Sequence, residues 1–367
     1  MKPIARSLAL PMALAGLPFL LVACAESGAE PGSEAEAAPA AASVDVFVGD
    51  RSVGCLEDPA CINRLHPDIP MVADADPGER IVFHGRDAFD LTLDPDEMSS
   101  APAKPHEGAG IVHALTGPVS INGAQAGDVI AVTIESLEPD SVGWTEASTF
   151  GFAGEEFGAE TYFIVWRMDD EYATSDALPG VRIPNASFPG VMTTMPDAEL
   201  TAEVLAREGV LFAEGGAGLP PDVIEATPQA LCGVDGTAPD ECLRTVPPRE
   251  HGGNMDIRYI TTGSTVYLPC LIDGCGLAVG DFHYAQGDGE VAGTAIEMGG
   301  TMTVRVEIVA DPPDLSHGPH YEGPSSVLAI PSERFHATTG FPLKEAGEVP
   351  ATLALSLIHI SEPTRLN

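Results

Sequence analysis

Residues 301–308 read Thr-Met-Thr-Val-Arg-Val-Glu-Ile, with polar and apolar side chains in strict alternation. Side chains of a β-strand point to opposite faces in turn, so Met302, Val304 and Val306 would share one face and the polar side chains the other. The stretch therefore predicts a strand with one face in the core of a β protein.

Other runs of β-branched and aromatic residues follow turn-forming Gly and Pro, and the chain holds 39 Gly and 33 Pro. The further predicted strands are residues 80–84, 128–134, 161–166 and 264–268. One segment, Asp197 to Glu208, has a helical pattern with Asp197 as its cap and Gly209 as its stop. The sequence thus predicts an all-β fold with few short helices.

The N-terminal segment has the pattern of an export signal. Basic residues precede an apolar run from Leu8 to Ala23, which is too short for a membrane-spanning helix. Leu-Val-Ala-Cys at 21–24 resembles a bacterial lipobox, which predicts a signal peptide at 1–23 and a lipid on Cys24; cleavage without lipidation is the alternative. Residues 24–43 then form a flexible tether, because they lack aromatic and large apolar side chains. We expect a protein of the bacterial cell envelope that faces the periplasm or the exterior.

The C-terminal segment differs in character from the rest. Residues 355–365 read LSLIHISEPTR, which resembles the translation of a sequencing-library adaptor. We therefore expect residues 355–367 not to belong to the natural chain, with a genuine strand and polar tail as the alternative. Residues 44–354 remain as the folded domain, of which 215–247 is a Pro- and Gly-rich insertion.

Six cysteines follow Cys24, in three close pairs: Cys55/Cys61, Cys232/Cys242 and Cys270/Cys275. In an oxidising compartment, this even number favours three short-range disulfides. A zinc site is the rival, but the spacings do not form two CxxC knuckles.

The charge balance excludes one class of partner. The chain carries 55 Asp and Glu against 17 Lys and Arg, a net charge of −38. Because a phosphate backbone must be neutralised by cations, a nucleic-acid binder is excluded, and docking to anionic lipid headgroups is disfavoured. With 44% hydrophobic residues the chain can build a core, so the acidic residues belong to the surface.

Residues that carry chemistry are concentrated between Pro247 and Glu297. If these segments are extended, Asn254 and Asp256 share one face of a strand, and Asp281 and His283 share one face of another. Gln286, Asp288, Glu290 and Glu297 follow, among glycines. His and carboxylates at this spacing match the requirements of metal-assisted hydrolysis. Any one of these carboxylates could instead be a solvated charge, and Gly-Asp-Gly-Glu at 287–290 could be a β-turn or a structural calcium loop.

Several familiar hydrolase motifs are absent from the sequence. It has neither a His-Glu-x-x-His zinc helix nor a Gly-x-Ser-x-Gly nucleophile elbow. A Ser-Ser-Lys catalytic site would need a Gly- and Ser-rich loop around a core lysine. Neither Lys104 nor Lys344 has such surroundings. A thiol nucleophile at Cys270 is disfavoured by the expected disulfide with Cys275.

Five stretches of the sequence resemble the acetamidase/formamidase family. The matching pieces are His113 to Pro118, Gly123 to Val129, Phe188 to Val191, His251 to Asp256 and Gly280 to Glu297. The resemblance covers residues from about Pro77 to Val309 and implies a sandwich-like all-β core and hydrolysis of a short linear amide. The signal peptide, cysteine pairs and insertion depart from the family, which leaves the amide open.

We therefore assign roles by residue type and spacing. Asp256, Asp281 and His283 would bind a divalent metal, with zinc favoured over calcium because of the histidine. Glu290 would act as acid/base, Asn254 and the amides of Gly252 and Gly253 would hold the oxyanion, and Gln286 and Glu297 would orient their neighbours.

Two functions of other classes remain open. One is a lipid-anchored binding protein that captures a small ligand on the same scaffold without cleaving it. The other is a β module stabilised by calcium. The sequence also leaves open whether the chain forms a homo-oligomer.

Overall fold

The computed structural model describes residues 45–91, 93, 111–147, 161–214 and 219–328, and the backbone of 334–338. All of these belong to one unit, residues 43–367. The predicted signal peptide (1–23), the lipidated Cys24 with its tether (24–43) and the adaptor-like tail (355–367) lie outside the described residues, as do residues 215–218 of the insertion.

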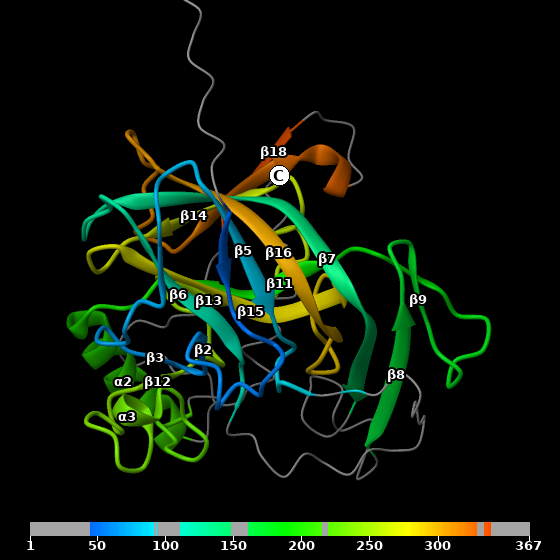
Figure 1. Cartoon of the computed structure of the whole chain (residues 1–367), viewed down its shortest axis with the longest axis horizontal. Coiled ribbons are helices and arrows are strands. Elements are labelled where there is room, and N and C mark those ends of the chain that lie inside the picture. Colours follow the sequence, from blue (N-terminus) through cyan, green and yellow to red (C-terminus); the bar gives the residue numbers. More distant parts are fainter. Residues whose placement is uncertain are drawn as a thin grey trace, which may run out of the picture. The chain divides into compact units, whose positions relative to one another are not determined.

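The described chain consists mostly of strands, which confirms the all-β class (Figure 1). The longer strands are β5 (Arg80–Gly85), β6 (Leu115–Ile121), β7 (Val129–Ala147), β8 (Tyr162–Met168), β11 (Phe188–Thr193), β14 (Thr265–Pro269), β15 (Cys275–Ala285), β16 (Ile296–Ile308), β17 (His320–Pro324) and β18 (Arg334–Thr338). The shorter ones are β1 (Val46–Val48), β2 (Cys61–Ile62), β3 (Arg64–Leu65), β4 (Ala73–Ala75), β9 (Tyr172–Thr174), β10 (Ile183–Pro184), β12 (Leu243–Arg244) and β13 (Gly252–Asn254). The helices are α2 (Ala198–Ala213), α3 (Gln229–Cys232) and the 3₁₀ helix η1 (Ser325–Leu328).

The alternating stretch at 301–308 lies in β16, between β5 and β7. Met302, Val304 and Val306 are at most 1% exposed and belong to the main hydrophobic core. On the other face, Arg305 pairs with Glu135 at 2.8 Å. The alternation therefore predicted both the strand and the face that it buries.

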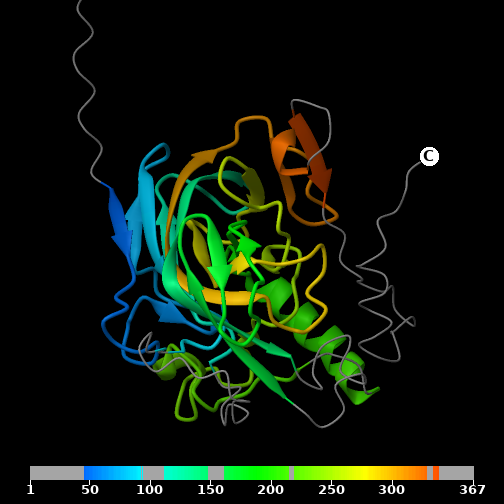
Figure 2. The same ribbon diagram turned by 90° about the vertical axis from the view of Figure 1, so that its right-hand side faces the viewer.

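The long strands change partners along their length, which folds one hydrogen-bonded network over the core (Figures 1 and 2). One edge of β15 pairs first with β6 and then with β16. β7 runs along β16, while its other edge pairs with β14 near its start and with β8 near its end. The apolar faces of these strands meet in a core that includes Phe83, Ile134, Leu268 and Phe282.

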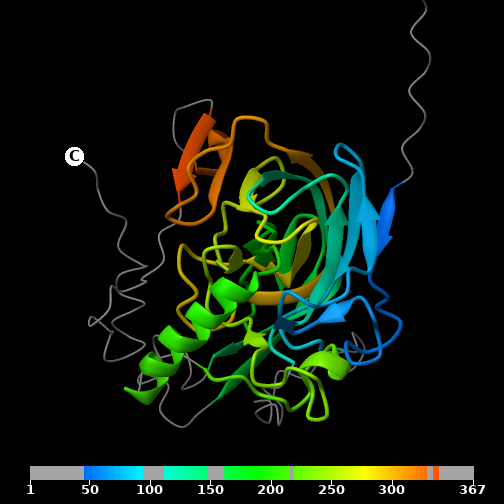
Figure 3. The same cartoon turned by 90° about the vertical axis from the view of Figure 1, so that its left-hand side faces the viewer.

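A second, smaller core lies where α2 and β12 meet β2 and β3 (Figures 1 and 3). Leu200 and Val204 of α2 pack there with Leu243 of β12. The insertion contributes to this core, because β12 pairs with β3 and its Leu243 is 1% exposed.

The helix prediction was right at its start and wrong at its end. Asp197 caps α2, accepting a hydrogen bond from the Leu200 N–H at 2.7 Å. The helix continues through Gly209 to Ala213. A helical glycine costs only about 1 kcal/mol relative to alanine. Ion pairs of Arg207 with Glu250 and of Glu208 with Arg249 hold the helical turn before Gly209 against the segment that precedes β13.

The three predicted cysteine pairs form disulfides: Cys55–Cys61, Cys232–Cys242 and Cys270–Cys275. All six cysteines are at most 1% exposed. Within the described residues, no helix is long and apolar enough to cross a membrane.

His251 attaches the start of β13 to the chain just after β11. Its Nδ1 lies 2.6 Å from the Thr194 carbonyl oxygen, which can only accept, so Nδ1 carries a proton. Its Nε2 is buried and has no hydrogen-bond partner among the described residues. Burial and the charge of Arg249 lower the pKa of His251 to about 4, against the weaker opposing effects of the Thr194 hydrogen bond and of Glu250. His251 is therefore neutral in the folded protein.

We predict that His251 makes stability depend on pH. Between pH 6.5 and about 4 the unfolded chain binds a proton at this histidine that the folded chain excludes. Its contribution is thus complete above pH 6.5 and is lost as the pH falls, by about 3 kcal/mol in all. In His251→Asn, which keeps a donor for Thr194, urea unfolding should depend less on pH across this range. Equal pH dependence in both proteins would contradict the assignment.

Candidate active site

A row of directly opposed residues crosses four strands of the sheet. His283 on β15 lies opposite Phe188 on β11 and Glu297 on β16, and Glu297 lies opposite Trp144 on β7. Opposed residues of antiparallel strands point to the same face, so these four side chains stand side by side. The Phe188 ring meets the His283 ring edge-on, with 4.9 Å between their centroids.

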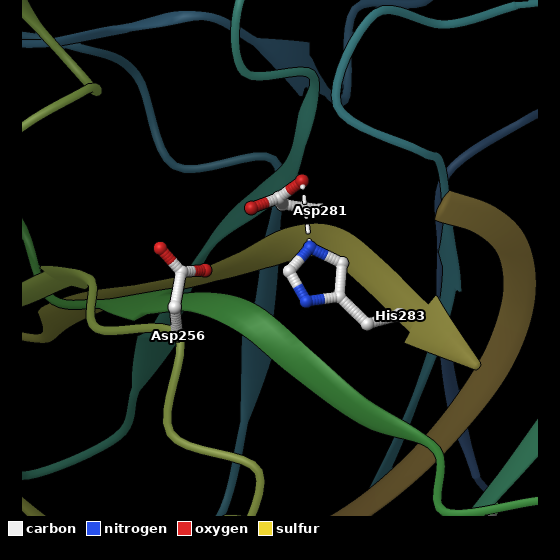
Figure 4. Close-up of side chains that lie close together, drawn as sticks. All are labelled: Asp256, Asp281 and His283. Carbon is white, nitrogen blue, oxygen red and sulfur yellow. Dashed lines mark ion pairs between the residues drawn. The ribbon is translucent and has the colours of Figure 1, made fainter. Parts of the chain in front are cut away.

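Two aspartates join this row from irregular backbone (Figure 4). Asp281 lies within β15 at φ 55°, and its Oδ1 is 3.4 Å from His283 Nε2. Asp256 follows β13 at φ 48°, so the strand ends at Asn254 and does not carry the two side chains on one face as predicted. Left-handed backbone at residues other than glycine is strained and is often found at functional sites. Asp256, Asp281 and His283 nevertheless converge, with potential ligand atoms within 4.8 Å of one another.

Gly190 makes room for the two aspartates. A Cβ atom at this position would lie 2.5 Å from Asp281 Oδ2 and 2.8 Å from Asp256 Oδ1. Its carbonyl oxygen also accepts hydrogen bonds from the N–H groups of Met255 and Asp256. A glycine is therefore required where β11 faces the cluster.

Two glutamates complete the cluster around His283. Glu297 Oε1 lies 3.4 Å and Glu290 Oε1 3.7 Å from His283 Nε2. Glu297 is held by the N–H of Ala295 at 2.8 Å, and its side chain is 2% exposed. The Glu290 side chain is 19% exposed, so it lies at the margin of the cluster. Asp288, in the same loop, points away and accepts from the Tyr259 hydroxyl.

Gln286 and Asn254 have structural partners. The Gln286 side-chain amide donates to the carbonyl oxygen of Asp256 at 2.9 Å, which ties the Asp256 turn to the end of β15. The Asn254 side-chain amide donates to the carbonyl oxygen of Val246. The N–H of Gly252 donates to the carbonyl oxygen of Arg249. The predicted oxyanion role of Asn254 and Gly252 thus stays a prediction.

The ionisation of the cluster reflects an excess of buried negative charge. Burial and the charge of Asp281 raise the pKa of Asp256 to about 8. Burial also disfavours the ionised form of Asp281, but His113 and His283 outweigh it and lower its pKa to about 2. Burial opposes a charge on His283, yet Glu297 and Asp281 raise its pKa well above the ordinary value.

Burial and neighbouring carboxylates also raise the pKa values of both glutamates. Burial and the charge of Asp256 raise the pKa of Glu290 well above its ordinary value. Burial is also the main cause of the raised pKa of Glu297. Three of the four carboxyl groups around His283 therefore favour the neutral form, and a bound cation would allow them to ionise.

Polar atoms at the cluster lack hydrogen-bond partners within the described part of the chain. They are Asp256 Oδ1, His283 Nδ1 and Nε2, Gln286 Oε1 and Glu297 Oε2. Buried polar atoms are normally paired, so such a group of atoms indicates a bound ion, water or ligand. A site with one imidazole and carboxylates fits zinc, whereas calcium prefers oxygen ligands alone.

Sequence reasoning did not assign three residues of this site. His113, which precedes β6, places its Nε2 3.9 Å from Asp281 Oδ2 and is held by Thr245 through its N–H and its Nδ1. Gly190 and Trp144 are the others. His113 and Gly190 lay in stretches that resembled the family, which was the available signal; Trp144 had none.

A family model and similar proteins of known sequence point to the same family. The model of the acetamidase/formamidase family matches residues 50–356. The chain is similar to a formamidase of Methylophilus methylotrophus (35% identity over 68% of this chain and 64% of the relative) and to an acetamidase of Mycolicibacterium smegmatis (32%, 67% and 65%). It thus spans just under two thirds of either relative's length. Among solved structures, a gamma lactamase from Delftia acidovorans matches with a TM-score of 0.68 at 30% identity, over 76% of this chain and 72% of the other.

If the cluster binds zinc, which its residues fit, Gly190→Ala should weaken that binding. The added methyl group would push against both aspartates, and displaced supporting groups cost roughly 10- to 100-fold in metal affinity. Equilibrium dialysis against zinc would measure the effect. Gly289→Ala is the matched control, because a Cβ there meets no atom within 4 Å. Zinc affinity equal in both variants would contradict the role of Gly190.

Proposed function

The chain belongs to the acetamidase/formamidase family, and from this premise we propose that it hydrolyses a short linear amide to a carboxylate and ammonia. The observation that carries the proposal is the convergence of Asp256, Asp281, His283, Glu290 and Glu297 in one buried cluster. Hydrolysis of an amide needs an activated water, a proton carrier and a polarised carbonyl group. Carboxylates and an imidazole in a site with low exposure can provide these functions.

Asp256, Asp281 and His283 would hold the metal, for which we propose zinc. The unpartnered Asp256 Oδ1, the buried imidazole and the excess of negative charge support this choice. When bound, zinc supplies Lewis acidity, which polarises a carbonyl group and makes water more acidic. Gln286 keeps Asp256 in place through its hydrogen bond to the Asp256 carbonyl oxygen.

Glu290 is our proposed proton carrier. It takes a proton from the attacking water as the water oxygen bonds to the carbonyl carbon, and it delivers the proton to the leaving nitrogen as the carbon–nitrogen bond breaks. Its position supports this role, because it lies beside His283 and is the more exposed of the two glutamates. Glu297 is fixed through Oε1 by the Ala295 N–H, so its Oε2 can accept from the amide nitrogen.

We predict different losses in two variants. Asp281→Asn should lose zinc and turnover together, and excess zinc should restore part of the turnover, because one ligand charge is missing. Glu290→Gln should retain zinc while ammonia release from formamide or acetamide falls by roughly two to four decades, the span for a lost acid/base. Metal analysis and ammonia assays would measure both, with circular dichroism as a folding check.

Asp288→Asn is the matched control for Glu290→Gln. Asp288 lies two residues away, its side chain is 76% exposed, and it is bonded to Tyr259. The turnover of the Asp288→Asn variant should stay near that of the wild type. Normal turnover in Glu290→Gln would instead leave Glu297 as the proton carrier. If the wild type binds an amide without releasing ammonia, the non-catalytic binding protein is favoured. If calcium raises the melting temperature and no amide is hydrolysed, the calcium-stabilised β module is favoured.

We further propose that the protein is exported and anchored in the bacterial cell envelope through a lipid on Cys24. The support is the order of a basic start, a short apolar run and Leu-Val-Ala-Cys at 21–24. Three disulfides in the domain agree with an oxidising compartment.

The anchor makes a separate prediction. Cys24→Ser should move the protein from the membrane fraction to the soluble fraction, because one residue carries both lipid attachment and processing. Fractionation followed by immunoblotting would show the shift. Retention of the variant in the membrane fraction would rule out Cys24 as the anchor.

A further inference from the structure

Trp144 has a buried N–H group that the interactions of the described residues leave unused. The side chain is 1% exposed, and its Nε1 has no hydrogen-bond partner. The chain's other tryptophan, Trp166, is also buried, but its Nε1 donates to Thr145 Oγ1 at 3.0 Å. A buried donor without an acceptor costs about 1–3 kcal/mol. Its retention beside the cluster therefore indicates an acceptor that arrives with a ligand.

The sheet register brings Trp144 to the cluster. It lies directly opposite Glu297, which in turn lies opposite His283, so Trp144 extends the same row on the same face. Two aromatic rings pack against the indole. Phe163 stacks on it at 5.4 Å and Phe89 lies against it at 5.3 Å between centroids. Trp144 is thus an immobilised donor beside the proposed reaction centre.

Glu297 provides the complementary group. Its Oε1 is occupied by the Ala295 N–H, while its Oε2 is buried without a partner. Neighbouring positions of the row therefore offer one unused donor, on Trp144, and one unused acceptor, on Glu297. A primary carboxamide carries the matching pair, a carbonyl oxygen that accepts and an NH₂ group that donates.

We propose that Trp144 is a substrate-binding residue whose indole N–H donates to the carbonyl oxygen of the amide while Glu297 Oε2 accepts from its NH₂ group. This rests on the proposed amidase function and deepens it. The pair discriminates against tertiary amides, because full substitution at nitrogen removes the hydrogen that Glu297 accepts. As negative charge develops on the carbonyl oxygen during attack, the N–H stabilises it more strongly.

A direct test observes the N–H itself. Because the chain has two tryptophans, ¹⁵N-labelled protein shows two indole cross-peaks, which Trp166→Phe assigns. Sodium acetate, the product of acetamide hydrolysis, presents carboxylate oxygens in place of the carbonyl. At a concentration that inhibits turnover, acetate should move the Trp144 cross-peak downfield and leave that of Trp166 in place, with sodium chloride as the blank. An unmoved Trp144 cross-peak under inhibition would overturn the proposal.

Kinetics give the second test. Trp144→Phe keeps an aromatic ring but removes the N–H, and kcat/KM for acetamide should fall by about 10²-fold, as for a lost oxyanion donor. Trp166→Phe is the matched control and should keep kcat/KM near the wild-type value, even if its melting temperature drops. Equal kcat/KM in the wild type and Trp144→Phe would refute the role of Trp144. Absence of ammonia release by the wild type from any short amide would instead refute the proposed function.

Discussion

The alignment of His283, Glu297 and Trp144 across three hydrogen-bonded strands is the constraint on which the site depends. A slip of one residue between β15 and β16 would turn Glu297 to the opposite face of the sheet. The same strand that presents Glu297 carries Met302 and Val304 into the main core. Packing of the core therefore specifies the register, and the register places the acid beside the histidine.

The price of this arrangement is a concentration of buried negative charge. Asp256, Glu290 and Glu297 have raised pKa values because each must ionise near other carboxylates and away from water. In a metal-free site the imidazolium of His283 compensates one charge. A bound cation would replace that proton, because a metal-ligating imidazole is neutral, and would give the unpartnered Asp256 Oδ1 a partner. The energetic strain of the cluster and its capacity to bind a metal have the same origin.

Backbone irregularity gives the cluster its shape. Asp256 and Asp281 both adopt left-handed conformations, at φ 48° and 55°, which regular strands would not provide. Gly190 leaves the space that their carboxylates share. The surrounding ladder of β11, β13 and β15 keeps these conformations in place, since Met255 and Asp256 donate to the Gly190 carbonyl oxygen. Sheet regularity and local strain thus work together at the site.

The sequence by itself determined the local features. Strict alternation predicted β16, cysteine spacing predicted the disulfides, and the density of acids and histidine between Pro247 and Glu297 located most of the cluster. These signals are short-range, because strand periodicity, turn formation and short loops act over a few residues. The end of α2 was missed because Gly209 does not end the helix, since a helical glycine costs only about 1 kcal/mol relative to alanine.

Only the tertiary structure decided which distant segments complete the site. His113, Trp144 and Gly190 come from three separate parts of the chain, and no local pattern distinguishes them from core residues. The end of the strand at Asn254, and the turn that brings Asp256 to Asp281, also depend on contacts with β11. Register between strands arises from the packing of whole faces, and the periodicity of one strand contains no information about the residue that lies opposite it.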